Sequence, residues 1–208
     1  MKLFNFHDRK PEIIGEIGYF GLSEWWQNEF SDDEREYIVD KYKPLGLGNK
    51  SLIEGDIYST SQSAIGLLSG LASWFNSEKD RTISYRALAK AESLLKDNSD
   101  ILDVHFLFNC KINIYYRHRN IDSDALDIAM EACRKQIEIA PKAKEAFTNN
   151  FKTDSLPSHR GYEQLSIIEE KLGNFENVIN ISKAALDQGW KGDWEKRIKR
   201  SEAKLNIT

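Results

Sequence analysis

The sequence is poor in cysteine and proline, with two cysteines and four prolines among 208 residues. Cys110 and Cys133 lie far apart and show no spacing typical of a metal site, so paired disulfides are not expected. Because proline is rare, long stretches of the chain are free to be helical. These scarcities exclude a disulfide-rich secreted domain and predict a cytoplasmic protein.

Long hydrophobic runs are also missing. The longest one, Ala64 to Phe75, is interrupted by serine and glycine and is too short to cross a bilayer. Met1–Phe6 is followed at once by charged residues, so we expect no signal peptide. The sequence therefore predicts no membrane association, and the apolar run is interpreted as a buried helix.

The chain has no excess of positive charge. Its formal net charge is −4 and its pI is about 5.7, which gives no general electrostatic reason to bind nucleic acid. Hydrophobic residues make up 40% and charged residues 30% of the chain, values that indicate a folded globular protein. Residues 1–60 are rich in acidic side chains, whereas residues 189–208 are rich in basic ones.

Known catalytic motifs are absent as well. The four histidines, of which His7 is the first, include no pair at i and i+4 with an acidic companion, so a helical zinc site is not predicted. Gly46–Ser51 resembles a phosphate loop only faintly, because Asn49 stands where a glycine must precede the lysine. We therefore predict a protein that is not an enzyme and that has no metal or cofactor. An enzyme of unfamiliar type, with His105, His118 or His159 beside a carboxylate, remains an alternative.

What the sequence does contain is helical periodicity over most of its length, which predicts an all-α fold. Residues 1–22 are interpreted as mostly extended or loop, and residues 142–157 as irregular with a short helix over Lys144–Asn149. Ser31 and Glu34 form a capping box before the second predicted helix. The remaining predicted helices are Ser23–Phe30, Asp32–Lys43, Ala64–Phe75, Thr82–Lys96, Ile101–Arg119, Ser123–Ile139, two within Tyr162–Trp190, and Asp193–Leu205.

The segment Tyr162–Trp190 is the most specific part of the sequence. It is predicted to form two amphipathic helices joined by a tight turn at Leu172–Phe175, in which Gly173 gives the backbone its freedom. A bulky residue, a leucine and small residues follow at fixed intervals, which lets two helices approach closely. These positions are Tyr162, Leu165, Ser166, Val178 and Ala185.

This spacing resembles the tetratricopeptide repeat, a unit of two antiparallel helices in about 34 residues. Glu169, Ser182 and Trp190 depart from the family pattern. A weaker copy upstream comprises Leu68, Leu71, Ala72, Phe75, Ser84, Leu88 and Ala91. A middle copy is split, its halves being Phe106, Asn109 and Cys110, and then Ala129, Cys133, Gln136 and Pro141. An unrelated α-helical bundle remains the alternative.

The resemblance implies a right-handed stack of helix pairs over residues 59–208, closed by the last helix as a cap. Residues 1–58 would form a smaller, aromatic-rich, acidic segment packed on that stack. The family mostly binds peptides or partner proteins in a groove lined by the first helix of each pair. The implied groove positions are Ser69, Ser73, Asn76, Lys111, Tyr115, Glu163, Ile167 and Lys171. Cys110 and Cys133 would lie on facing helices as buried thiols.

Two further features fall outside the repeat pattern. Trp25 and Trp26 are adjacent and cannot face the same side of a helix, so we predict that they are partner-binding anchors, with burial inside the protein as the alternative. Arg117 and Arg119 follow two tyrosines and could contact phosphate or nucleic acid, although cations at a helix end also offset its dipole. Together these features predict a non-catalytic adaptor or regulator that binds a protein or peptide. Its alternative is a nucleic-acid- or nucleotide-binding protein that uses these arginines and the basic last helix.

Overall fold

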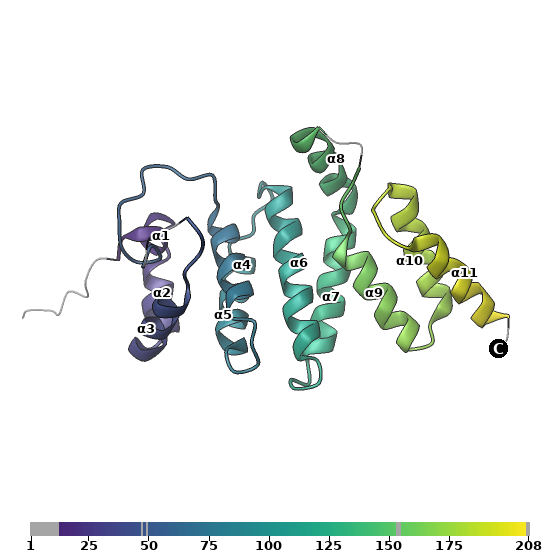
Figure 1. Cartoon of the computed structure of the whole chain (residues 1–208), viewed down its shortest axis with the longest axis horizontal. Coiled ribbons are helices and arrows are strands. Elements are labelled where there is room, and N and C mark those ends of the chain that lie inside the picture. The colour runs from purple at the N-terminus through teal and green to yellow at the C-terminus, as the bar shows by residue number, and fades with distance from the viewer. Residues whose placement is uncertain (1–12, 47, 49, 153–154, 207–208) are drawn as a thin grey trace, which may run out of the picture. The chain divides into compact units, whose positions relative to one another are not determined.

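The computed structural model describes residues 13–206, with the exception of 47, 49, 153 and 154 (Figure 1). The described residues form eleven helices and no strand, apart from an isolated bridge between Ser158 and Lys191. The prediction of an all-α chain is therefore confirmed. The chain divides into two compact units, residues 1–67 and 68–208. The predicted division at 58/59, and the packing of the first part on the second, stay predictions.

Unit 1 contains three short helices, α1 (Gly15–Tyr19), α2 (Ser23–Glu29) and α3 (Asp32–Lys41). The predicted capping box at α3 is confirmed, because the Glu34 amide donates to Ser31 Oγ and the Ser31 amide donates to Glu34 Oε2 at 2.9 Å. The interior of the unit is apolar and aromatic. Its most deeply buried side chains include Ile17, Leu22, Trp26, Phe30, Ile38 and Leu52.

Helix α1 corrects the prediction of extended or loop structure within residues 1–22, whose first twelve residues lie outside the described part. The amides of Gly15, Glu16 and Ile17 donate to carbonyl oxygens of Gly55, Ser51 and Leu52 at 2.9–3.0 Å. These bonds supply the partners that the first turn of a helix lacks. Since they come from residues about 35 positions away, no local sequence pattern could reveal them.

Unit 2 contains the last part of α4 (Ala64–Trp74) and the remaining helices (Figure 1). Helix α6 packs on α7, α9 packs on both α6 and α7, and α10 packs on α9 and α11. None of the helices in the described residues has the length and apolar character needed to cross a membrane. The helices after α4 are α5 (Arg81–Ser93), α6 (Ile101–His118), α7 (Ala125–Glu138), α8 (Ala140–Phe151), α9 (Arg160–Lys171), α10 (Phe175–Gln188) and α11 (Trp194–Leu205).

The helix pair predicted within Tyr162–Trp190 is present as α9 and α10. Gly173 has a φ of +79° in the turn between them, and Gly189 has a φ of +84° at the end of α10. Both values lie in the left-handed region that favours glycine. The amide of Tyr162 donates to His159 Nδ1, so that this histidine caps the start of α9.

Helix α8 is longer and more regular than predicted. The sequence indicated an irregular segment over 142–157, because Pro141 was interpreted as the end of the preceding helix. Proline is tolerated in the first turn of a helix, where its missing N–H costs no hydrogen bond. Pro141 accordingly lies in the first turn of α8, which buries Ala143 and Phe147.

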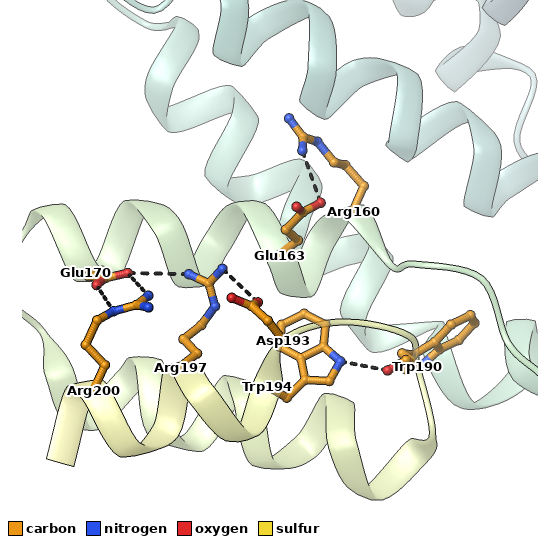
Figure 2. A network of polar contacts seen from close by, with 8 residues as sticks. All are labelled: Arg160, Glu163, Glu170, Trp190, Asp193, Trp194, Arg197 and Arg200. Atoms are coloured by element: carbon orange, nitrogen blue, oxygen red, sulfur yellow. Dashed lines mark hydrogen bonds and ion pairs between the residues drawn. The ribbon is translucent and has the colours of Figure 1, made fainter.

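The last helix also differs from its predicted pattern. Trp194 and Ser201 are buried as expected, but Leu205 is exposed, and the basic residue Arg197 is buried instead. A buried guanidinium is tolerated only when its charge is paired. Arg197 donates to Asp193 at 3.3 Å and to Glu170 of α9 at 3.4 Å, as Figure 2 shows.

Candidate functional site

The three described histidines, His105, His118 and His159, are all buried. The rings of His105 and His159 lie 5.1 Å apart, and both rings contact the Trp190 indole. Burial lowers the pKa of His105 to about 4, and burial together with the neighbouring His105 lowers the pKa of His159 to about 3. An efficient general base has a pKa near the working pH. These two imidazoles are therefore suited to packing and capping rather than to proton transfer at neutral pH.

The two thiols are buried on the facing helices α6 and α7, as predicted. Burial raises the pKa of Cys110 to about 11 and that of Cys133 to about 12. A nucleophilic cysteine needs a lowered pKa, because the thiolate is the reactive form. No group of three or more histidine, cysteine or acidic side chains in the described part of the chain could hold a metal ion.

The adjacent tryptophans of α2 have different surroundings. Trp26 is 2% exposed, whereas Trp25 is half-buried, and each ring centre lies 5.3 Å from that of Phe30. The Trp26 indole is therefore part of the unit 1 core and offers little surface to a partner. Trp25 keeps an exposed edge.

Two of the clefts of unit 1 are lined by described residues. The first, of about 900 Å³, has an apolar floor that includes Trp26 and Val39, with acidic and basic side chains of α3 at its rim. The second, of about 780 Å³, is lined by polar groups that include Ser51 and the buried Glu16. Burial raises the pKa of Glu16, against the effect of the Ser51 hydroxyl, which donates to its carboxylate at 3.3 Å. Neither cleft gathers the groups of a recognisable catalytic site.

Four predicted partner-binding residues lie on α4 and α6 of unit 2 or directly after α4. Ser73 Oγ is 3.0 Å from Cys110 Sγ, and Asn76 is half-buried. Lys111 forms an ion pair with Glu92 of α5, which also accepts from Lys135 at 3.2 Å. Tyr115 stacks face to face on Tyr85 of α5, with ring centres 4.3 Å apart. Most of this set is thus engaged within the unit.

A polar network missed at the sequence level lies beside these residues. Asp122, just after α6, accepts from Arg81 Nε and from Tyr85 Oη, both at 2.9 Å. The bidentate contact with Arg81 is completed by a second bond of 3.2 Å. These bonds join the start of α5 to the turn between α6 and α7.

The remaining predicted residues lie on α9 and at the end of α6. Glu163 accepts from Arg160 at 3.2 Å within α9 (Figure 2), and Arg117 is exposed. Lys171 Nζ donates to the hydroxyl of Tyr116 at 3.1 Å. The guanidinium carbon of Arg119 lies 4.0 Å from the centre of the Tyr116 ring. The structure therefore brings Lys171 and Arg119 together around a tyrosine that was not among the predicted site residues.

Tyr116 has a phenol in unusual surroundings. Burial alone would raise its pKa, but the hydrogen bond from Lys171, the charges of Arg119 and Lys171, and the Gln164 side chain together lower it. A lowered pKa of a phenol indicates positive electrostatic potential at its oxygen. The only sequence signal was its place directly before the Arg117–Arg119 run. Its contact with α9, 55 residues away, could not be inferred from that place.

Helices α9 and α11 are connected by a network centred on Glu170 (Figure 2). Its carboxylate accepts two hydrogen bonds from Arg200, at 2.8 and 3.0 Å, and one from Arg197. These bonds hold α11 against α9, and the two arginines neutralise the negative charge of Glu170. At the start of α11, a separate hydrogen bond runs from the indole N–H of Trp194 to the carbonyl of Trp190 at 2.7 Å.

Comparison with known proteins identified no relative of the chain. No protein-family model, curated protein sequence or solved structure matches the chain significantly.

Proposed function

We propose that the chain is a non-catalytic adaptor or regulator of the cytoplasm, and that unit 2 is a tetratricopeptide-like stack that binds a peptide or partner protein. The arrangement of α6 with α7 and of α9 with α10 supports this proposal. Helix α9 packs on both members of the preceding pair, as stacked two-helix units do. In this interpretation α8 is an addition to the two-helix unit, and the split of the middle copy follows from α6, which continues to His118 before the turn that leads to α7.

The observation that carries the proposal is the contact of Lys171 with Tyr116, at 3.1 Å. It joins the first helices of two successive pairs, α6 and α9, on one surface. Aromatic and cationic side chains that remain accessible are typical of the positions that contribute most to binding energy. We define this α6/α9 surface by Tyr115, Tyr116, Arg119, Ile167 and Lys171. Trp25 of unit 1 is retained as a further anchor, whereas the buried Trp26 is not.

A peptide array tests this function. The full-length chain is probed with synthetic peptides in which each sequence is present in unmodified, acidic and phosphorylated forms, and binding is then measured by fluorescence anisotropy. We expect Tyr116→Ala to weaken binding of the selected peptides about tenfold or more, as loss of a central aromatic contact does. The matched control is Tyr58→Ala, which removes a tyrosine that is 93% exposed in unit 1. Absence of binding to every form of every peptide would contradict the proposed function.

A further inference from the structure

The donors around the Tyr116 hydroxyl leave its own proton without an acceptor in the described residues. Lys171 donates to this oxygen at 3.1 Å, and an ammonium group can only donate. The Gln164 side chain lies near enough to help lower the pKa of the phenol, but its amide nitrogen forms no hydrogen bond with the oxygen. The phenol must therefore direct its O–H away from the Lys171 ammonium, and the exposed setting of this bond leaves that proton open to solvent.

Gln164 of α9 is a buried neighbour of the Tyr116 phenol. The residue is 1% exposed, and its amide nitrogen Nε2 has no hydrogen-bond partner in the described structure. Because the Gln164 amide makes no hydrogen bond to Tyr116, the Lys171 ammonium is the group that donates to the phenol oxygen.

The two cations beside Tyr116 have no carboxylate partner among the described residues. The carboxylates of α9 are occupied elsewhere: Glu170 pairs with Arg197 and Arg200 and Glu163 with Arg160, as Figure 2 shows. The buried Glu169 accepts hydrogen bonds from Asn174 and Asn177. Arg119 uses one N–H for the carbonyl of Tyr116, at 2.6 Å, which leaves other guanidinium donors available. The local charge of Arg119 and Lys171 is therefore not neutralised by the chain itself.

Helix dipoles account for only part of this charge. Arg119 is the C-cap of α6, and Lys171 is the last residue of α9. Each helix end carries about half a negative charge, so two full positive charges exceed what the ends require. The lowered pKa of Tyr116 agrees with this net positive potential.

From this geometry we propose that the α6/α9 surface binds the phosphate group of a phosphorylated peptide. A phosphate carries nearly two negative charges at neutral pH and accepts several strong hydrogen bonds, which matches two unpaired cations and an outward phenol O–H. The donors to the phosphate are Tyr116, Arg119 and Lys171. This proposal rests on the proposed function and names the chemistry of its ligand.

A peptide is favoured over a nucleic acid for two reasons. Nucleic-acid strands present a row of singly charged phosphates and are bound by extended basic tracks, whereas this site gathers two cations around one tyrosine. Carboxylates of Glu163 and Glu170 lie on the same helix as Lys171, and the whole chain has a net charge of −4. A single dianionic group therefore fits the site better than a polyanion does.

The first test locates the site with inorganic phosphate. Backbone amide NMR shifts of the full-length chain are recorded during a phosphate titration at constant ionic strength, with chloride as the reference anion. We expect saturable shifts at residues 116–119 and 164–171, which disappear in Lys171→Met and persist in Lys196→Met, a control that removes an exposed lysine of α11. Shifts that are absent from those residues, or that respond equally to both substitutions, would overturn the site.

The second test uses matched peptides from the array, each with serine or phosphoserine at one position, and a single-stranded oligonucleotide as competitor. We expect the phosphopeptide to bind at least tenfold more tightly than its serine form, since charge-assisted hydrogen bonds contribute about 1.5–3 kcal/mol. Lys171→Met should remove this difference and Lys171→Arg should retain it. Equal binding of both forms would overturn the phosphate proposal but leave the proposed function intact, and tighter binding of the oligonucleotide would overturn both. If neither form of any peptide binds, the proposed function itself fails.

Discussion

The helices of unit 1 have five, seven and ten residues, whereas α5 to α11 of unit 2 have between 12 and 18. Helices of one or two turns gain little from their own hydrogen bonds, so unit 1 depends on backbone bonds between α1 and residues 51–55 and on the packing of Trp26. The longer helices of unit 2 bury continuous apolar stripes against their neighbours. The comparison teaches that contacts remote in sequence determine the structure of unit 1, while periodic patterns determine most of unit 2.

The largest expected effect concerns the core of unit 1. We expect Trp26→Ala to lower the free energy of unfolding of this unit by about 3–5 kcal/mol, because it empties a fully buried aromatic site. Trp25→Ala is the matched control, since its half-buried ring should cost clearly less. Chemical denaturation followed by residue-resolved hydrogen exchange measures both. Equal losses for the two variants would contradict the assignment of Trp26 as core and Trp25 as surface.

Acid should weaken unit 2 through its buried histidines. The pKa of His105 falls from 6.5 to about 4 on folding, so the unfolded chain binds more protons between these values. The stabilisation is complete above pH 6.5 and is lost as the pH falls towards 4, by about 3 kcal/mol for this group. Hydrogen exchange of unit 2 as a function of pH measures the loss. The dependence should be reduced in His105→Phe, and stability that stays constant down to pH 4 would refute the lowered pKa.

Alanine substitutions at two glycines with positive φ separate the cost of a steric clash from the cost of a left-handed backbone. A Cβ added to Gly15 of unit 1 would lie 2.6 Å from the carbonyl oxygen of Ser51, whereas one added to Gly173 of unit 2 would meet nothing within 4 Å. Gly173→Ala should therefore lower the free energy of unfolding by about 1–2 kcal/mol, which is the cost of holding alanine in a left-handed conformation. Gly15→Ala should lower it by more. Thermal unfolding of the two variants compares them. A larger loss for Gly173→Ala would show that the contact of α1 with the 51–55 segment is unimportant.

The smallest expected effect is that of Glu16, whose contribution to stability depends on pH in the opposite direction from that of the histidines. Burial raises the pKa of Glu16, so its contribution to the stability of unit 1 is present at low pH and is lost as the pH rises through the folded-state pKa. Glu16→Gln should therefore stabilise unit 1 slightly at pH 7 and leave it unchanged at pH 4. Hydrogen exchange of residues 15–55 at both pH values is the measurement. Destabilisation at pH 7 would indicate that the carboxylate is needed in its charged form.

The same division separates what the sequence could predict from what it could not. Apolar spacing predicted the helices from Ala64 onward, and the Ser31–Glu34 pair predicted the start of α3, because both signals lie within one helix. Helix α1 was missed because its partners are the carbonyls of residues 51–55. Helix α8 was predicted too short because Pro141 is compatible with either end of a helix.

For the candidate site, the sequence indicated Lys171 and Arg119 separately but not that they meet. Their meeting depends on the packing of α6 against α9, which brings Tyr116 and Lys171 together over 55 intervening positions. Tyr116 and Gln164 were not predicted at all, since a tyrosine before an arginine run and a glutamine within a helix are common. Ion pairs such as Glu170 with Arg200 were missed for the same reason, and they determine which cations remain unpaired.

Hydrogen exchange of the full-length chain, with and without its tightest peptide from the array, tests most directly whether function resides in unit 2. The account predicts slower exchange in the second half of α6 and in α9, and unchanged exchange in α1, α2 and α3. Protection confined to the residues that line the clefts of unit 1, with α6 and α9 unchanged, would contradict it.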